Sequence, residues 1–554
     1  MLKLRSLTFS YRADGRQFTL KTSSSAENRR VSVCILSDEE RFDVRLALRT
    51  PVEITHLSAE FEYRFDEDMR IFLNGYQSWT DSREYSINET MRGIDHIPAP
   101  IREKYAFASY GDYRITEYSR KKGCLHGFSY GYIRNRDDEY QLIASLGEDD
   151  GFTVIKTDTA AGTITAEKDC SGYIAEKSYR GLSLYIGKGT EDEVFDRYFE
   201  LLGIPAPAAD RIWGYTSWYR HYQNISRDTI AEDLNGFEGC ENAMDVFQID
   251  DGYQTAVGDW LSVDKTKFPD PMEVLSGMIK NAGMTPGIWI APFVCEEKSQ
   301  LFREKKDWLV CTDDGDPIKC GGNWSGFYAL DIYNKEVQRY IAEVFDNAVN
   351  IWGFGLLKLD FLYAACIRPP KNKTRGMVMR DAMELLREYS YGAKILGCGV
   401  PLASAFGRVD YCRIGTDVSL DWDDKPYMQL MHRERPSTKN TVLNSVFRRQ
   451  LNGRAFISDP DVFLLRDNDT TMTRRQRQLL CEVNALCGGV LFTSDDNAGY
   501  GEWQQSMIGE MKRLQNAKII SAGLYNGTLV LTIELDGRVI TRAYEHGQSN
   551  NTSK

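Results

Sequence analysis

The stretch Gly355-Leu356-Leu357-Lys358-Leu359-Asp360 is a short apolar run that ends in a carboxylate, and this pattern decides the fold. Eight such runs follow one another after Trp213, and each ends in polar, Gly or Pro residues. Short apolar runs bounded by turn residues are typical of buried strands. The predicted strands are residues 214–219, 246–250, 287–292, 355–360, 394–398, 411–414, 455–459 and 489–493.

Segments able to form amphipathic helices lie between most of these strands. They are residues 229–237, 271–282, 335–349, 375–389 and 474–485. Strand followed by helix, repeated eight times over roughly 280 residues, predicts a (β/α)8 TIM barrel, a fold of about 250 residues. The connection at residues 399–410 is too short for a full helix, so we expect it to lack one.

The segments before and after the predicted barrel have a different pattern of apolar and polar residues. Residues 1 to about 200 consist of short alternating or β-branched runs, which predict a β-sandwich. At the other end, residues 518–524, 528–535 and 538–544 are separated by Asn-Gly and Asp-Gly, the dipeptides of tight hairpin turns. We therefore predict an N-terminal β-sandwich (1–205), a catalytic barrel (206–512) and a small antiparallel β domain (513–554), with a frayed tail at 549–554.

Composition excludes several classes of function. Lys and Arg number 68 against 80 Asp and Glu, and with no long basic run this argues against a nucleic-acid partner. No apolar stretch approaches the roughly 20 residues of a membrane span, and the N-terminus lacks the features of a secretory signal, so we predict a cytoplasmic protein. Twelve Cys without a CxxC pair predict reduced thiols, and six unpaired His argue against a His-based metal site.

Carboxylates stand at the ends of the predicted strands, where the active site of such a barrel is built. Asp250-Asp251, Asp360, Asp459-Pro460-Asp461 and Asp495-Asp496 end four strands, and Asp417 follows a fifth. A single strand-end Asp is more often a helix cap. Five on one rim indicate a site for metal binding, for acid/base work on a carbon acid, or for glycoside cleavage.

Aromatic residues lie on the same rim and favour glycoside cleavage. Trp218 follows the first strand, Trp260 the second, Trp289 lies within the third, and Trp422 follows Asp417. A sugar has an apolar C–H face and a hydroxyl edge, so flat rings beside carboxylates suit it. We therefore predict that Trp218, Trp289 and Trp422 contact a sugar substrate.

Several motifs resemble, in the same order, those of the α-galactosidases of glycoside hydrolase family 36, in its compact single-chain bacterial branch. They are Phe247-Gln248-Ile249-Asp250-Asp251-Gly252-Tyr253-Gln254, Gly287-Ile288-Trp289-Ile290-Ala291-Pro292-Phe293, Leu357-Lys358-Leu359-Asp360-Phe361, Leu396-Gly397-Cys398-Gly399, Arg413-Ile414-Gly415-Thr416-Asp417 and Ser458-Asp459-Pro460-Asp461. Together they extend over about 250 residues. Thr416 stands where close relatives have a proline.

Carried over residue by residue, the resemblance implies that Asp360 is the nucleophile and Asp417 the general acid/base. A retaining glycosidase needs two such carboxyl groups about 5 to 5.5 Å apart. Lys358 lies two residues before Asp360, on the same face of a strand, where its charge would hold a nearby carboxylate ionised or bind a sugar hydroxyl. The resemblance also implies that Arg413 contacts the sugar.

The remaining predicted binding residues also come from the resemblance. It implies that Asp250 and Asp251 accept hydrogen bonds from the C4 and C6 hydroxyls of galactose. It places Cys398-Gly399 near the C2 substituent. It further implies that the loop Asn74-Gly75-Tyr76-Gln77-Ser78-Trp79 reaches over the barrel mouth, so that Trp79 stacks on the substrate.

We expect a retaining exo-α-galactosidase that acts on oligosaccharides or glycoconjugates and uses neither a cofactor nor a metal. The first alternative is an α-N-acetylgalactosaminidase, which differs in the room around C2. The second is a galactosyl transferase of the raffinose-synthase type, which prefers a sugar acceptor to water, and the third is a sugar-binding protein on an inactive barrel. The sequence leaves the aglycone, the linkage and the oligomeric state open.

Overall fold

The central part of the molecule is a parallel β-barrel. The computed structural model describes residues 2–237, 244–423, 425, 427–428 and 431–547. Eight parallel strands form the barrel sheet in the order β25-β24-β23-β22-β18-β17-β16-β26, and a backbone hydrogen bond of 2.9 Å from Gly489 N to Ser458 O bridges its two edges. The strands are β16 (Ile212–Thr216), β17 (Val246–Ile249), β18 (Thr285–Ile290), β22 (Leu356–Leu359), β23 (Lys394–Gly397), β24 (Tyr411–Arg413), β25 (Ile457–Asp459) and β26 (Val490–Thr493). The predicted (β/α)8 barrel is confirmed.

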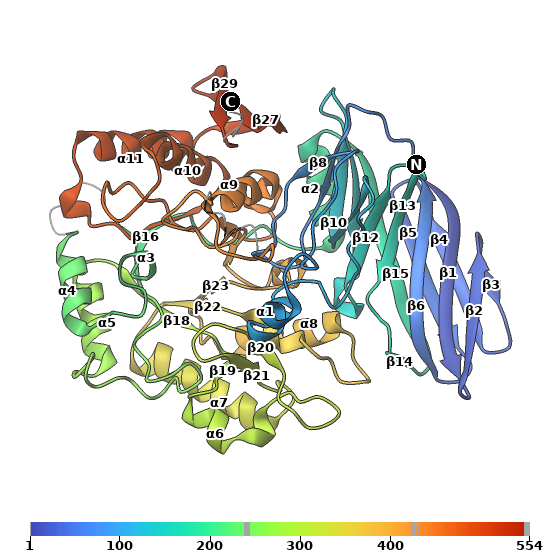
Figure 1. Ribbon diagram of the computed structural model, residues 1–554, viewed down its shortest axis with the longest axis horizontal. Coiled ribbons are helices and arrows are strands. Elements are labelled where there is room, and N and C mark those ends of the chain that lie inside the picture. The colour runs from blue at the N-terminus through green and yellow to red at the C-terminus, as the bar shows by residue number, and fades with distance from the viewer. Residues whose placement is uncertain (1, 238–243, 424, 426, 429–430, 548–554) are drawn as a thin grey trace.

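Helices alternate with these strands and cover the outside of the barrel (Figure 1). They are α4 (Arg227–Asn235), α5 (Met272–Asn281), α7 (Lys335–Asp346), α8 (Arg375–Tyr389), α9 (Thr438–Phe447), α10 (Arg474–Cys487) and α11 (Glu502–Leu514). As predicted, the β23–β24 connection carries only the 3-10 turn η6 (Leu402–Ala405). The first predicted strand is too long, because its last residues, Trp218 and Tyr219, begin the short helix α3 (Trp218–His221).

Side-chain caps define where several barrel helices begin. Thr473 precedes α10, and its hydroxyl accepts a hydrogen bond from the backbone N–H of Gln476. The Gln476 side chain in turn accepts from the N–H of Thr473, so two otherwise unpaired donors are satisfied. Ser299 caps α6 (Gln300–Glu304) and Thr374 caps α8 in the same way through one bond each. Polar turn residues therefore separate the strands from the helices.

Two antiparallel sheets pack face to face before the barrel, as the predicted β-sandwich. The first sheet consists of β1 (Lys3–Ala13), β2 (Arg16–Thr22), β6 (Val52–Glu62), β9 (Cys124–Phe128), β12 (Thr153–Asp158), β13 (Thr163–Lys168) and β14 (Ile174–Ala175). The second consists of β3 (Ala26–Glu27), β4 (Val31–Ser37), β5 (Arg41–Leu48), β7 (Arg70–Leu73), β8 (Glu84–Ser86), β10 (Tyr130–Arg134), β11 (Tyr140–Ser145) and β15 (Ser178–Gly189). Buried apolar side chains of both sheets form one core between them.

Loops of the sandwich extend to the barrel. The segment between β8 and β9 contains α1 (Ala99–Lys104) and η1 (Phe107–Ser109), and α1 lies beside β20 (Lys319–Gly321) of a small barrel-side sheet (Figure 1). That sheet also contains β19 (Val294–Glu296) and β21 (Phe327–Ala329). Helix α2 (Glu191–Leu202) connects the sandwich to β16. Tyr76 and Trp79, which follow β7, belong to the apolar core that fills the barrel.

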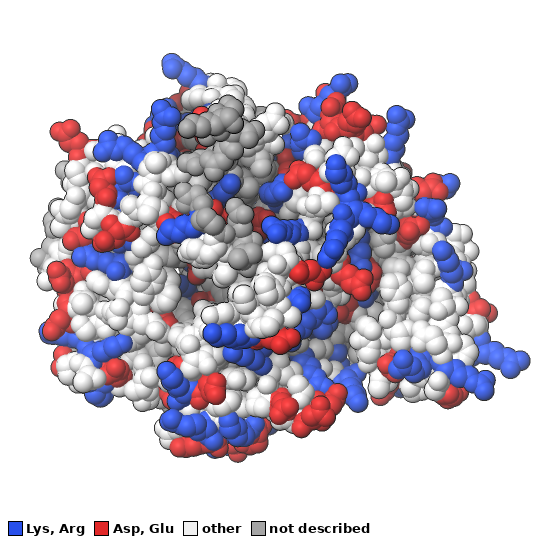
Figure 2. Space-filling model, viewed as in Figure 1, with Lys and Arg blue, Asp and Glu red and all other residues white. Residues whose placement is uncertain are grey.

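A three-stranded antiparallel sheet of β27 (Lys518–Tyr525), β28 (Thr528–Leu535) and β29 (Arg538–Glu545) ends the described chain, within a residue of the predicted strands. The predicted frayed tail, 549–554, lies outside the described residues. Lys and Arg intermingle with Asp and Glu on the face in Figure 2. The eleven Cys of the described ranges are all free thiols. None of the helices described is both long and apolar enough to cross a bilayer.

Candidate active site

The predicted carboxylates and cations gather at the carboxyl ends of the barrel strands. Asp250 and Asp251 follow β17, Asp360 follows β22, and Arg413 is the last residue of β24. All four are at most 8% exposed. Charged groups that are buried this far need partners, and these partners come from neighbouring strands.

Two N–H groups hold the carboxylate of Asp360. The indole of Trp289, on the adjacent strand β18, donates to Oδ2 at 3.0 Å. The backbone N–H of Phe361 donates to Oδ1 at 2.8 Å, because the chain turns there into a left-handed conformation with φ of 54°. Both oxygens are thereby oriented, and two predicted site residues, Trp289 and Asp360, lie in contact.

Lys358 and Asp250 form a buried ion pair across the barrel rim. The ammonium Nζ lies 2.7 Å from Asp250 Oδ2, and both side chains are at most 8% exposed. Burial alone would lower the pKa of Lys358, but the negative groups around it, Asp250 first among them, together raise that pKa above its usual value. Lys358 is therefore a fixed cation in the site.

Asp251 accepts hydrogen bonds from three side chains. They come from Gln254 at 2.5 Å, Gln223 at 2.8 Å and the indole of Trp324 at 2.8 Å. Burial raises the pKa of the Asp251 carboxyl above its usual value, although these donors oppose the rise. Trp324 was not predicted as a site residue. It comes from a loop between β20 and β21, and nothing in its local sequence indicates this contact.

Arg413 joins three carboxylates. Its Nη1 lies 2.7 Å from Asp417 Oδ1, its Nε 2.9 Å from Asp459 Oδ2, and its Nη2 2.9 Å from Asp461 Oδ1. Asp461 also accepts a hydrogen bond from the Tyr219 hydroxyl. Arg413 thus neutralises a cluster of acids, and it orients Asp417. The sequence placed Asp459 and Asp461 at a strand end, but their pairing with Arg413 was not predicted.

Asp417 differs from the other carboxylates. With 36% of its side chain exposed, it is the most accessible of the acids around Arg413. Withdrawal from water raises the pKa of Asp417 to about 7; Arg413 opposes the rise, and the neighbouring carboxylates Asp461 and Asp360 add to it. The raised pKa favours the protonated form that a general acid needs.

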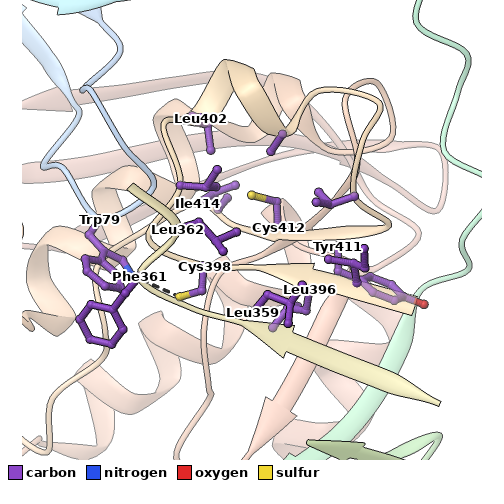
Figure 3. Packing of buried hydrophobic residues seen from close by; sticks show 14 of the residues in the cluster. Trp79, Leu359, Phe361, Leu362, Leu396, Cys398, Leu402, Tyr411, Cys412 and Ile414 are labelled. Atoms are coloured by element: carbon purple, nitrogen blue, oxygen red, sulfur yellow. Dashed lines mark hydrogen bonds between the residues drawn. The ribbon is translucent and has the colours of Figure 1, made fainter. Parts of the chain in front are cut away.

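Trp79 of the sandwich loop lies over the barrel segment that follows β23 (Figure 3). Its indole N–H points to the sulfur of Cys398 at 3.3 Å, and its ring meets Phe361 edge to face at 5.1 Å. Gly399 has a φ of 56°, and a Cβ there would lie only 2.9 Å from the Trp79 ring. Close approach of the two segments therefore requires glycine at this position.

Trp422 and Trp218, both predicted to contact the sugar, pack against other side chains. The indole of Trp422 donates to the backbone carbonyl of His546 at 3.3 Å, and its ring contacts the His546 ring edge to face, so Trp422 packs against the C-terminal segment. This placement corrects the prediction that Trp422 lies beside the carboxylates. Trp218 begins α3, and its ring meets Tyr222 at 5.2 Å. The recorded contacts of Trp218 do not join it to the carboxylate cluster.

A cavity of about 620 Å³ opens beside Asp417, Trp79 and Phe361. These three are the residues of the candidate site that line it. Across the described residues, no group of three or more His, Cys, Asp or Glu side chains has the arrangement of a metal site. The candidate site consists of carboxylates, two buried cations and aromatic side chains.

Comparison with known proteins relates part of this site to a family. Residues 215–373 match the melibiase family. The matched segment includes Asp250, Asp251, Lys358 and Asp360, whereas Arg413 and Asp417 follow it.

Curated relatives match parts of the chain. An α-galactosidase of Escherichia coli is 35% identical over 212 residues, which are 35% of this chain and 28% of that protein. The bifunctional α-galactosidase/sucrose kinase AgaSK of Mediterraneibacter gnavus is 29% identical over 153 residues, 26% of this chain and 15% of that protein. The match thus spans less than a third of the length of these relatives.

A solved structure matches nearly the whole chain. The α-galactosidase TtGalA of Thermus thermophilus, in complex with p-nitrophenyl α-D-galactopyranoside, superposes with a TM-score of 0.73 and 25% identity. The match covers 93% of this chain and 98% of that one. The predicted resemblance to the α-galactosidases of glycoside hydrolase family 36 is confirmed.

Proposed function

We propose that the chain is a retaining exo-α-galactosidase. The observation that carries the proposal is the pair of carboxyl groups that follow β22 and β24, which are held in different ways. Asp360 is oriented by two N–H donors, whereas Asp417 faces a cavity and has its pKa raised to about 7. A nucleophile and an acid with separate environments are what double displacement needs.

In the first step, an oxygen of the Asp360 carboxylate forms a bond to the anomeric carbon as the bond from that carbon to the leaving oxygen breaks. Asp417 gives its proton to the leaving oxygen, so the aglycone departs as an alcohol. In the second step, the Asp417 carboxylate takes a proton from water, and the water oxygen displaces Asp360. Two inversions leave the galactose in its original α configuration.

The buried polar groups at the strand ends are suited to hold one galactose unit. Asp250 and Asp251 are acceptors for sugar hydroxyls, and Lys358 is a donor beside them. These side chains are almost fully buried, so they favour a terminal sugar that enters the closed end of the site. This supports an exo mode of action.

Three observations bear on the alternatives. The Cys398–Gly399 segment, which the resemblance places near C2, is covered by Trp79. That contact favours a hydroxyl over the bulkier acetamido group of an α-N-acetylgalactosaminide. Relatives solved with p-nitrophenyl α-galactopyranoside and with stachyose support an α-galactoside substrate. The presence of both Asp360 and Asp417 disfavours a binding protein on an inactive barrel.

The test measures initial hydrolysis rates on p-nitrophenyl α-galactoside and p-nitrophenyl α-N-acetylgalactosaminide, with the Asp360→Asn variant as the blank. We expect cleavage of the galactoside alone and a loss of turnover on the order of 10⁴-fold or more in Asp360→Asn. Faster cleavage of the acetamido sugar would favour the first alternative. Transfer to added sucrose in preference to water would favour the transferase.

The role of Asp417 is tested separately. In Asp417→Ala, the first step still proceeds for substrates with good leaving groups, because these depart without a proton. We expect added azide to restore turnover of p-nitrophenyl α-galactoside and to form a galactosyl azide. A variant equally inactive on all substrates, with or without azide, contradicts an acid/base role.

A further inference from the structure

The cavity beside Asp417 has a largely apolar wall from the N-terminal part of the chain. The segment that contains α1 and η1 contributes seven residues to the lining, which also includes Trp79 and Phe361 of the candidate site. The seven are His96, Ile97, Pro98, Ile101, Tyr105, Phe107 and Tyr110. Since Asp417 faces this cavity and is the proposed proton donor to the leaving oxygen, the cavity is on the aglycone side.

Two polar side chains of this cavity, Asn323 and Glu434, already accept hydrogen bonds from the protein. Asn323 Oδ1 accepts from the Tyr110 hydroxyl at 2.5 Å. The buried Glu434 accepts at both oxygens, from Thr80 at 2.9 Å and from Tyr113 at 2.8 Å. These acceptors are therefore less available to the hydroxyl groups of an aglycone.

The cavity also keeps large apolar side chains in contact with water. Ile101 is 42% exposed and Tyr105 is 40% exposed, and both line it. The ring of Tyr105 stacks on Phe107 at 5.6 Å, which extends the apolar surface inward. Exposed apolar side chains that gather around a concave site commonly mark a binding surface.

We propose that this cavity selects α-galactosides whose aglycone is apolar, such as an alkyl chain, over those whose aglycone is a second sugar. The inference rests on the proposed function and names its substrate class. A second sugar needs hydrogen-bond partners along its hydroxyl edge, and two acceptors of this wall, Asn323 and Glu434, are occupied. An alkyl chain needs none, and its burial against Ile101 and Phe107 is favourable.

The test compares kcat/KM for methyl, butyl and octyl α-galactoside, each below its micelle concentration, and for raffinose. The three alcohols have nearly equal basicity as leaving groups, so differences among them report contact with the aglycone. We expect octyl α-galactoside to exceed methyl α-galactoside by roughly tenfold or more, and to exceed raffinose.

A matched pair of variants locates the effect. Ile101→Asn places an amide in the cavity wall and is expected to lower the octyl-to-methyl ratio at least threefold. Ile174→Asn is the control, because Ile174 is exposed to the same degree, 44%, but lies in β14 of the sandwich. Neither change removes a buried side chain, so both variants are expected to fold.

The outcomes separate this inference from the proposed function. A rise with chain length that Ile101→Asn reduces and Ile174→Asn leaves intact supports the apolar aglycone site. Equal rates for methyl and octyl α-galactoside, or a preference for raffinose, overturn it and leave the α-galactosidase proposal in place. If no α-galactoside is cleaved, the proposed function fails and this inference fails with it.

Discussion

Asp417 has its pKa raised to about 7 mainly by burial, and this sets the expected pH dependence of the reaction. The acid role requires the protonated form, whose fraction falls as the pH rises through the pKa. We expect kcat/KM for a substrate with an alkyl or sugar leaving group to decrease above pH about 7. The measurement is a pH profile of kcat/KM. A substrate with a good leaving group is the control and is expected to show a weaker decrease.

Asp461 provides a check on the cause of that shift. Its negative charge contributes to the raised pKa of Asp417, and it shares Arg413 with Asp417. Asp461→Asn removes the repulsion and leaves Arg413 to stabilise the Asp417 carboxylate, so the pKa of Asp417 falls. The decrease in kcat/KM should therefore move to lower pH. An unmoved profile in a variant that unfolds at the wild-type temperature would contradict this assignment.

The buried ion pair of Lys358 and Asp250 affects both stability and binding. Lys358→Met leaves the Asp250 carboxylate buried without its 2.7 Å partner, which typically costs about 3 to 5 kcal/mol of unfolding free energy. Adding Asp250→Asn removes the uncompensated charge and should recover much of that loss. Urea unfolding of the two single variants and the double variant measures the coupling. We expect the double variant to regain stability without regaining activity.

At the scale of elements, Arg448 joins the Trp79 loop to the barrel. Arg448 directly follows α9 and is fully buried, and it forms no ion pair with a carboxylate of the described residues. Burial lowers the pKa of Arg448 to about 10. It donates to Ser78 O at 2.6 Å, to Ile414 O at 2.8 Å and to Asn74 Oδ1 at 2.9 Å. One side chain thus positions both the loop and the segment leading to Asp417.

We expect Arg448→Met to raise KM for p-nitrophenyl α-galactoside at least tenfold and to lower the unfolding free energy by about 3 kcal/mol, because several buried carbonyls lose their donors. Arg449→Met is the matched control. Arg449 is also buried, but it pairs with Glu191 of α2 and does not bond the loop. If both variants raise KM equally, the effect is general destabilisation and the positioning role is wrong.

The barrel strands and the C-terminal hairpins could be predicted because each is a local pattern. An apolar run with turn residues at both ends, as in β22, or Asn526–Gly527 between β27 and β28, needs no distant information. The carboxylates at the strand ends followed from the same pattern. The end of the first predicted strand was wrong, because Trp218 extends the apolar run in the sequence but begins helix α3 in the structure.

The contacts made between distant segments could not be predicted from local sequence. Trp79 donates a hydrogen bond to Cys398, which lies 319 residues away in the sequence. Helix α1 contains no buried side chain, so its sequence does not indicate that it forms part of a cavity wall. Trp422 was expected at the site from its position after Asp417, but its partner is the C-terminal His546. Such pairings depend on how separate layers pack, and only the resemblance indicated the Trp79 loop.

For the whole molecule, the N-terminal sandwich is part of the candidate site. Its Trp79 covers Gly399, and its α1 segment forms one wall of the cavity beside Asp417. The two parts also share apolar packing, since Phe72, Tyr76 and Trp79 are continuous with the barrel core. The candidate site therefore contains residues from both sides of the proposed domain boundary at residue 205.

This arrangement predicts the result of dividing the chain. Residues 206–554 produced alone would expose the apolar surface that Tyr76 and Trp79 cover, so we expect poor solubility and no measurable turnover of p-nitrophenyl α-galactoside. Co-production of residues 1–205 as a separate chain should restore some activity, because the ion pairs of Arg454 with Asp192 and Asp196 and of Arg449 with Glu191 tie α2 to the barrel. Trp79→Ala in the N-terminal chain is the control and should reduce that restored activity. An isolated barrel as active as the full chain would contradict a site built from both parts.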